Sequence, residues 1–369
     1  MILRIQRYIY REVLTAVAFV TLGFLALFFF FDFVDELRWV RRGSPDGYQA
    51  SHALLYVMLS MPSHLYELLP ITVLIGTIYV MARLAQSSEY TILRTSGFGP
   101  ARALRMLAGL GVAFVALTFA VGDYVAPVTD RLAQFVKARY EGRITLGQTG
   151  AWLRERQGGN TYSVNVRALL GAGSMQSVRI FEFDPQGYLV SITQARSGNI
   201  APGGGWDLAG VQRMVFHTRD GDHAHVEHLQ LDTWHWPTQI SREMTSAALL
   251  DPDRMRTIDL FKYIRHLDAN GQSAQRYEIE FWRKVFYPLS CLVMMVLALP
   301  FAYLHFRSAG LATYVFGGVM AGISFFLLNN MFGYIGNLQH WSPWLAAASP
   351  GMIYSVLSLA AFGWLVLRR

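Results

Sequence analysis

Long apolar stretches without charged side chains alternate along the chain with short polar segments. Residues 13–31 carry no charge, and a helix of that length is about 29 Å long at ~1.5 Å per residue, close to the ~30 Å hydrocarbon layer of a membrane. Residues 106–122 and 285–304 have the same character. Residues 308–367 contain no Asp, Glu, Lys or Arg, and His340 is the only histidine there, so this apolar region is long enough for two spans.

A sixth apolar stretch, residues 54–82, contains Pro62, Glu67 and Pro70. Neighbouring helices can satisfy the carbonyl groups that a proline leaves without a donor, so we expect a bent spanning helix there. The first span is longer than the apolar core of a signal peptide, and no small-residue cleavage site follows it. The pattern therefore predicts six spans and no cleaved leader.

Residues 125–280 show a different pattern. Short runs that alternate apolar and polar residues are separated by turn sequences such as D-P-Q-G at 184–187. An alternation with a period of two is typical of half-buried strands, which suggests an antiparallel sandwich or jelly roll. The expected strands are 161–166, 177–183, 188–193, 211–217 and 225–231, followed by a helix at 257–271.

The predicted fold class is therefore an α-helical polytopic membrane protein with six transmembrane helices and an inserted all-β, jelly-roll-like domain. Residues 1–124 would hold the first three spans, with a short helix at about 87–97. Residues 125–280 would hold the β domain and its flanking helical connectors, and residues 281–369 the last three spans.

Charge places these segments relative to the membrane. Only 15% of the 369 residues are charged, against about 25% in soluble proteins. The net charge is +7, and basic residues cluster before the first span, after the second and fourth spans, and at the C-terminus. With six spans these clusters share one side, which the positive-inside rule assigns to the cytoplasm. We expect both termini in the cytoplasm and the β domain in the periplasm, although the basic segment 35–43 disagrees.

Signatures of catalysis are missing from the sequence. Lysine occurs only at 137, 262 and 284, and none follows a glycine, so there is no phosphate-binding loop of the G-x₄-G-K-[ST] type. No Ser/His/Asp, HExxH or cysteine-pair pattern is present, and the lone Cys291 excludes an intrachain disulfide. We expect no enzymatic activity, no cofactor and no nucleic-acid partner.

Five histidines gather in the β region, at positions 217, 223, 225, 228 and 235. A zinc site needs several ligands that converge on one face. His223 and His225 share a strand face, but His228 has the opposite parity. A polar strand face is therefore favoured over a metal site.

The polar segment between the second and third spans predicts a helix of about two turns. Ser87 or Ser88 is placed to cap it, and Gly97 is placed to end it. It is either an amphipathic connector on the lipid headgroups or a docking helix for a cytoplasmic protein. Charges of both signs around an apolar patch favour the docking helix, because an anionic membrane prefers uniformly basic residues. The candidate docking residues are Ser88, Glu89, Ile92, Leu93, Arg94 and Gly97.

Four segments carry a family pattern in order along the chain: RYIYREVL at 7–14, YELLP at 66–70, ARLAQSSEYTILRTSGF at 82–98 and YEIEFWRKVFYPLSCLVMMVLALPF at 277–301. Together they resemble the LptF/LptG permeases, which export lipopolysaccharide from the inner membrane of Gram-negative bacteria. The aromatic-Lys-x₃-Pro-Leu-Ser string is closer to the LptG members than to the LptF members.

This resemblance implies an ATP-driven exporter whose permease subunits carry no nucleotide site. It implies four protein partners: an LptB-like ATPase dimer, an LptF-like permease subunit, LptC and, through a periplasmic bridge, LptA. Residues 87–97 would be the coupling helix that the ATPase holds, with Glu89 as the charged contact and Ile92 and Leu93 as apolar contacts. Lipopolysaccharide would be the substrate.

The resemblance also implies a lipid cavity between two permease subunits, lined by their first and fifth spans. The aromatic end of the first span suits acyl chains, but equally suits a helix that faces ordinary lipid. The arginines beyond it suit the phosphates of lipid A, or form a solvated collar at the interface. Asp32 is an acid where some relatives have lysine. The candidate substrate residues are Phe28, Phe31, Asp35, Arg38, Arg41 and Arg307.

Two other functions remain as alternatives. A scaffold for envelope assembly would keep the spans and the β domain but would not need the capped helix at 87–97. A secondary transporter needs paired charges inside the membrane, and only Glu67 lies within a predicted span.

Overall fold

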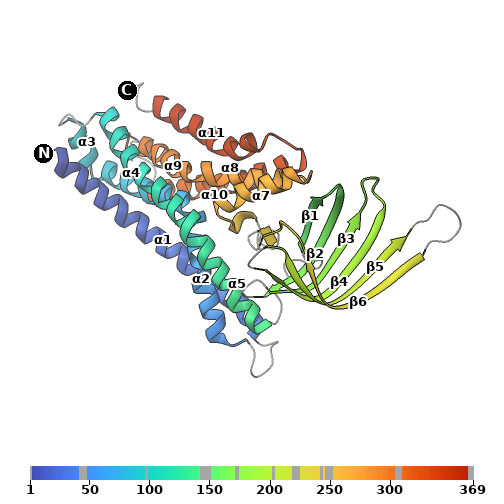
Figure 1. The fold of residues 1–369 in the computed structure, drawn as a ribbon. Helices are drawn as coiled ribbons and strands as arrows, with labels where there is room; N and C mark the ends of the chain where they lie inside the picture. Colours follow the sequence, from blue (N-terminus) through green and yellow to red (C-terminus); the bar gives the residue numbers. More distant parts are fainter. Residues whose placement is uncertain are drawn as a thin grey trace. The chain divides into compact units, whose positions relative to one another are not determined.

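The computed structural model divides the chain into two compact units, drawn in Figure 1. The helical unit comprises Met1–Arg42, Gln49–Ala133 and Glu278–Arg369, and the β unit comprises Gly43–Tyr48 and Gln134–Tyr277. The structure describes residues 2–40, 48–95, 99–141, 151–170, 174–201, 204–217, 225–241, 244–245, 252–303 and 310–364.

Six helical segments in the described residues are long and apolar enough to cross a membrane, which confirms the predicted number. The first two are single helices, α1 (Ile2–Val40) and α2 (Ala50–Gln86). The third is built from α4 (Pro100–Ala120), the π-helical segment η1 (Val121–Val125) and α5 (Ala126–Glu141). The fourth joins α8 (Gln275–Phe286), η4 (Tyr287–Leu289), α9 (Ser290–Ala298) and η5 (Leu299–Tyr303). The last two are α10 (Leu311–Leu338) and α11 (Pro343–Phe362).

The first and third spans extend well beyond the predicted stretches. α1 has 39 residues and is therefore about 58 Å long, which exceeds the hydrocarbon layer. The acidic and basic residues from Asp32 to Arg38 continue this helix, so the segment expected as a loop at 35–43 is helical up to Val40. The uncharged run at 13–31 therefore corresponds only to the part of α1 that is apolar enough for the membrane core.

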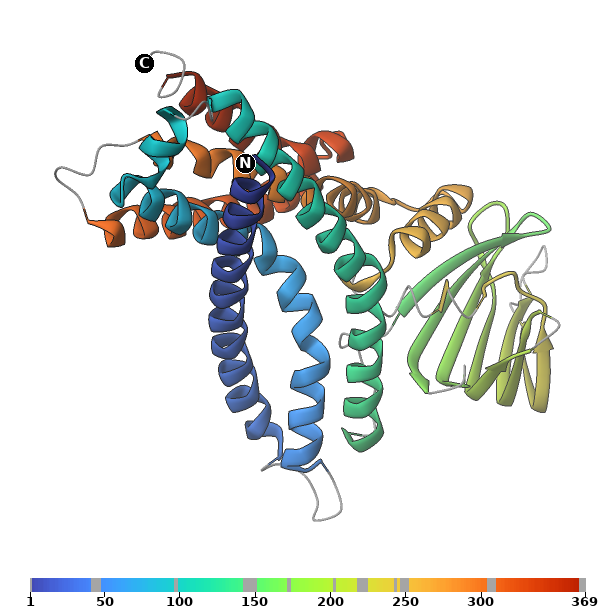
Figure 2. The ribbon, with the colours of Figure 1, turned by 90° about the vertical axis from the view of Figure 1, so that its left-hand side faces the viewer.

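The second span lies at the centre of the helical unit. α2 contacts α1, α9 and α10, and Figure 2 shows α1 and α2 side by side over much of their length. Glycines allow this close packing: a Cβ on Gly76 would lie 2.8 Å from the backbone nitrogen of Val17 in α1. Small residues at such contacts let spanning helices approach closely, where van der Waals packing holds them together.

The β unit contains one antiparallel sheet in which neighbouring strands follow sequence order. Its strands are β1 (Ala151–Gln157), β2 (Asn160–Leu170), β3 (Ser174–Phe183), β4 (Leu189–Ile200), β5 (Trp206–His217) and β6 (His225–Trp236). The unit also contains η3 (Pro252–Arg254) and α7 (Thr257–Ala269). The inserted all-β region is confirmed, with a simpler strand order than the two-sheet arrangement that the pattern suggested.

β1 was not expected because its sequence, AWLRERQ, carries three charged residues in seven positions. The buried Glu155 is compatible with this strand because it accepts two hydrogen bonds, from the hydroxyl of Thr238 and from the backbone nitrogen of Gln239, the latter at 2.7 Å. A paired carboxylate can therefore lie at a position where the alternation pattern expects an apolar side chain.

On three neighbouring strands, the alternation of buried and exposed side chains shifts by one residue at the same level of the sheet. At this level two successive buried residues are three positions apart, where regular strands have an even spacing. The pairs are Met175 and Val178 on β3, Ala195 and Gly198 on β4, and Leu208 and Val211 on β5. Gly210 has a positive φ of 64° at this level of β5. An irregularity of this kind bends a sheet and brings both sets of side chains to the same side.

Glu182 forms a buried polar cluster on the inward side of the sheet. Its carboxylate accepts hydrogen bonds from Asn160 at 3.0 Å, Tyr162 at 2.9 Å, Ser191 at 2.7 Å and Arg213 at 3.1 Å. Burial by itself would raise the pKa of Glu182, but these four donors together outweigh it and lower the pKa below the ordinary value.

We predict that this cluster makes the stability of the β unit depend on pH. Because the folded-state pKa is depressed, the stabilisation is present above the ordinary pKa of glutamate, 4.5, and is lost as pH falls through the lower folded-state value. Thermal unfolding of the full-length protein in detergent, followed between pH 7 and pH 3, should show this loss in the transition of the β unit. Glu182→Gln should reduce the pH dependence of that transition, and an unchanged pH dependence would contradict the prediction.

Candidate docking and lipid-binding sites

A short helix, α3 (Glu89–Thr95), follows α2 at one end of the helical unit. It has seven residues. Its first backbone hydrogen bond runs from the nitrogen of Ile92 to the carbonyl of Ser88 at 3.1 Å. Ser88 itself has a positive φ of 61°. The hydroxyl of Ser87 instead donates to the carbonyl of Leu84, so Ser87 closes the end of α2 and does not cap α3. The sharp turn at Ser88 thus separates α3 from the spanning helix.

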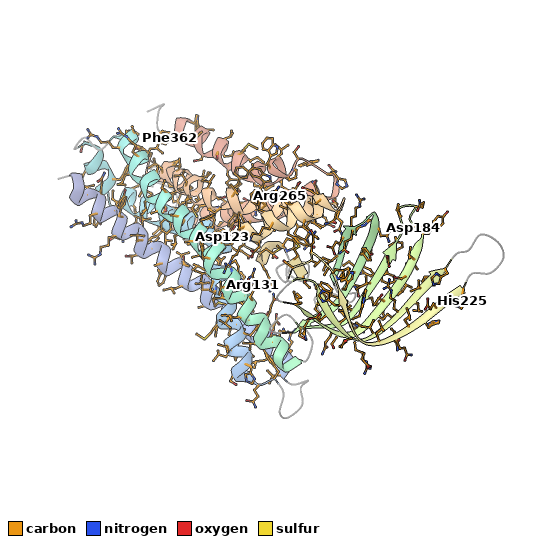
Figure 3. The ribbon with its side chains drawn as sticks, viewed as in Figure 1. Asp123, Arg131, Asp184, His225, Arg265 and Phe362 are labelled. Atoms are coloured by element: carbon orange, nitrogen blue, oxygen red, sulfur yellow. The ribbon has the colours of Figure 1, made fainter. Side chains whose placement is uncertain are left out.

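Tyr90 anchors α3 to the helical core. Its side chain is buried and its hydroxyl donates to the hydroxyl of Tyr303 at 2.9 Å, while the two rings meet edge to face at 5.2 Å. Leu84 of α2 belongs to the same cluster, and Phe362 of α11, labelled in Figure 3, packs against it. The helix is therefore fixed to the ends of the second and fourth spans.

Polar contacts also join α3 to the start of α1. The hydroxyl of Tyr8 donates to the Glu89 carboxylate at 3.2 Å, and one turn further along, Arg83 donates to Glu12 at 2.6 Å. Figures 1 and 2 show α3 at the same end of the helical unit as the start of α1 and the end of α11. Displacement of α3 would therefore act on several spans at once.

Several described side chains of α3 are exposed on the surface of the helical unit. Ile92 is 63% exposed, a large value for an isoleucine on a helix that Tyr90 anchors to the core, and Glu89 is also exposed. Leu93 and Arg94 belong to α3, but their side chains lie outside the described part of the chain, as does Gly97. Of the predicted docking residues, the structure thus brings Ser88, Glu89 and Ile92 together on one short element.

The second candidate site lies at the opposite end of α1. His64 of α2 contacts Asp32 at 2.6 Å between Nε2 and Oδ2, and its ring lies 5.0 Å from the ring of Phe28. Asp32 is therefore engaged by the neighbouring helix. The sequence did not single out His64, because only the packing of α2 on α1 brings it to this position.

Of the other candidate substrate residues, the three that the structure describes, Phe31, Asp35 and Arg38, are exposed along the same end of α1. Phe31 is 58% exposed, and Arg38 pairs with Asp35 at 3.5 Å, where both side chains are mostly exposed. An exposed ion pair of this kind contributes little stability, so Arg38 remains available to another anion. Arg41 and Arg307 lie outside the described residues.

Two histidines of the β unit, His217 and His235, each pair with a different carboxylate. His217 contacts Glu227 at 3.1 Å, and His235 contacts Asp207 at 2.7 Å. Among the residues that the structure describes, no group of three or more His, Cys, Asp or Glu side chains is arranged to hold a metal ion. His223 lies outside those residues.

Comparison with known proteins identifies the family. Residues 7–367 match the family model described as "Lipopolysaccharide export system permease LptF/LptG". The lipopolysaccharide export system permease protein LptG of Escherichia coli (strain K12) is 28% identical over 368 residues, covering 99% of this chain and 98% of that protein.

The protein of the same name from Haemophilus influenzae is 26% identical over 372 residues, covering 100% of this chain and 99% of that protein. The match confirms the resemblance found in the sequence, and it supports a permease over a scaffold or a secondary transporter. From its full-length match, its six membrane-spanning segments and its inserted β sheet, we conclude that this chain is a multi-pass membrane protein of the LptF/LptG family of lipopolysaccharide export permeases.

Proposed function

We propose that this chain extracts lipopolysaccharide from the bacterial inner membrane under the drive of a separate ATPase and passes it to a periplasmic bridge. In this proposal α3 is the part that an LptB-like ATPase dimer holds, in the cytoplasm together with both termini. An LptF-like subunit would complete the membrane cavity, and LptC and LptA would continue the route. These partners follow from the family resemblance.

The proposal rests mainly on the construction of α3. A connector that only joined two spans would need neither a buried tyrosine anchor nor an exposed isoleucine beside a glutamate. An exposed apolar side chain beside a charged one is typical of a contact that another protein covers. The bonds from α3 to α1 and to Tyr303 provide a route by which force on α3 would reach the spans.

The exposure of the spans supports a lipid cavity formed with a second subunit. Among the six spanning segments, the first and the fifth have the smallest buried share of side chains. Their exposed residues include large apolar side chains such as Phe31 on α1 and Phe316 on α10. These surfaces would contact acyl chains or the partner permease.

One edge of the sheet supports transfer to a periplasmic bridge. β6 pairs only with β5 among the described strands, and its residues from His225 to Thr233 are exposed on both faces. An exposed edge of this kind can be extended by a strand of another chain. We propose that this edge, or that of β1, meets the next β domain of the bridge.

A labelling experiment tests the cytoplasmic position of α3. Thr95→Cys, in a chain whose Cys291 is replaced with alanine, carries one exposed thiol on α3. A membrane-impermeant maleimide should label it only after the inner membrane is opened. Labelling in cells with an intact inner membrane, but a permeable outer membrane, would place α3 in the periplasm and refute the proposal.

We predict that replacing both Arg38 and Arg41 with alanine lowers ATP-dependent release of lipopolysaccharide from reconstituted vesicles about tenfold, since a charge-assisted hydrogen bond contributes roughly 1.5–3 kcal/mol. The matched control is Arg265→Ala, which removes an exposed arginine from α7, labelled in Figure 3. Release that is equal in the double variant and the control would remove these arginines from the substrate site.

A further inference from the structure

A lysine is buried inside the fourth span. Lys284 is 7% exposed, and it lies on α8 at the start of the fourth span, where Glu280 and Arg283 pair at 2.6 Å. A charged side chain at such a position is costly and generally has a function. Neither the docking helix nor the candidate lipid site uses it.

The lysine binds a carbonyl in an irregular part of the third span. Its Nζ donates to the carbonyl of Gly122 at 3.2 Å, and lies 5.9 Å from the centre of the Tyr66 ring. Gly122 belongs to the π-helical segment η1, which Asp123 marks in Figure 3. A π turn weakens the regular backbone bonding, and inside a membrane its carbonyls need another donor.

Gly122 also provides the space in which the second span approaches. A Cβ at this position would lie 2.3 Å from Cε2 of Tyr66, so only glycine accommodates the ring of Tyr66 at this distance. Tyr66 in turn packs on Tyr287 with ring centres 5.1 Å apart, and the hydroxyl of Tyr287 donates to the carbonyl of Glu67 at 2.5 Å. The second, third and fourth spans are thus joined at one level.

Each of the three spans has an irregular backbone near this level. α2 contains Pro70 one turn from Tyr66, the third span contains η1, and the fourth changes from α8 to the 3₁₀ segment η4 three residues after Lys284. A break of this kind lets a helix bend, and a proline or a π turn is the usual cause. If one of these three spans bent alone, it would move away from the other two. A hydrogen bond between spans at this level would keep the three together.

We propose that Lys284 is a positioning residue for transport, which holds the π turn of the third span so that the second, third and fourth spans move as one body when α3 is displaced. α3 lies between the second and third spans in the chain, so these two receive any displacement first. Through its bond to Gly122, Lys284 would transmit this displacement from the third span to the fourth. The inference depends on the proposed function, because it assigns Lys284 to the path between the ATPase and the lipid.

The test uses the purified permease complex with its ATPase in vesicles containing lipopolysaccharide, and measures lipopolysaccharide released per ATP hydrolysed. Lys284→Met keeps a side chain of similar shape without the donor or the charge, and should lower this ratio about tenfold, within the usual range of coupling free energies. Lys284→Arg, which keeps both, should recover most of it. Lys262→Met, which replaces an exposed lysine on α7, should match the wild type.

A second variant covers the case in which Lys284→Met does not fold. Gly122→Ala should lower the ratio as well, because its methyl group meets Tyr66, whereas Gly351→Ala on α11, where no atom lies within 4 Å of the added Cβ, should match the wild type. Wild-type ratios in Lys284→Met, or in Gly122→Ala where Lys284→Met is unfolded, would overturn the role of Lys284. Release by the wild type without ATP would overturn the proposed function and this role with it.

Discussion

Replacing Ile92 with aspartate is expected to release the ATPase from the permease. Ile92 is an exposed apolar side chain on α3, and a central apolar contact of a protein interface typically contributes about 2 kcal/mol or more. A buried aspartate would add the cost of an unpaired charge, so binding should weaken by at least about thirtyfold. The ATPase that co-purifies from detergent with the variant complex measures this loss.

The control for this variant is Ile258→Asp on α7. Ile258 is 53% exposed, similar to Ile92, but lies in the β unit and outside the proposed docking surface. The two variants add the same charge to similarly exposed positions, so a general effect on solubility would affect both. Equal amounts of ATPase with both variants would show that Ile92 is not a contact.

Replacing Gly76 with alanine is expected to separate α1 from α2 and to destabilise the helical unit by about 3 kcal/mol, the upper part of the range for overpacked cores. The new methyl group would lie 2.8 Å from the backbone nitrogen of Val17 and 2.9 Å from its Cα. Backbone atoms cannot rotate away, so α1 itself must move. The move would also stretch the buried hydrogen bond between Thr21 and Thr72, which is 2.9 Å long. Thermal unfolding of the full-length protein in detergent measures the loss.

Gly23→Ala is the matched control. Gly23 lies in α1, and no atom lies within 4 Å of the position that its Cβ would take. The substitution should therefore leave stability unchanged or raise it slightly, since alanine favours a helix over glycine by about 1 kcal/mol. If Gly76→Ala unfolds at the same temperature as Gly23→Ala, the close contact of α1 and α2 does not determine the stability of the unit.

The spans and the inserted sheet were accessible from sequence because each leaves a periodic signal. Long apolar stretches located all six spans, and the alternation of apolar and polar residues located five of the six strands. The bounds of α1 were not accessible, because helix geometry continues through the charged residues from Asp32 to Arg38 that end the apolar run. β1 was missed because a buried carboxylate, Glu155, replaces an apolar side chain.

The sites were predicted less completely than the fold. The exposed residues of α3 follow from a local pattern of caps and charges, which one segment of sequence contains. The anchors of α3, Tyr8 and Tyr303, are far from it in sequence, so only the folded chain brings them there. The same holds for His64 beside Asp32 and for Lys284 beside Gly122. Long-range pairs of this kind leave no periodic signal.

A photocrosslink from α3 would show which molecule docks on it. A photoreactive amino acid in place of Ile92, activated in living cells that produce the whole export system, reports what covers this side chain. We predict a covalent adduct with the ATPase whose yield changes with its nucleotide state. Adducts formed only with lipid, or with a periplasmic protein, would contradict the claim that α3 is the docking point of the motor.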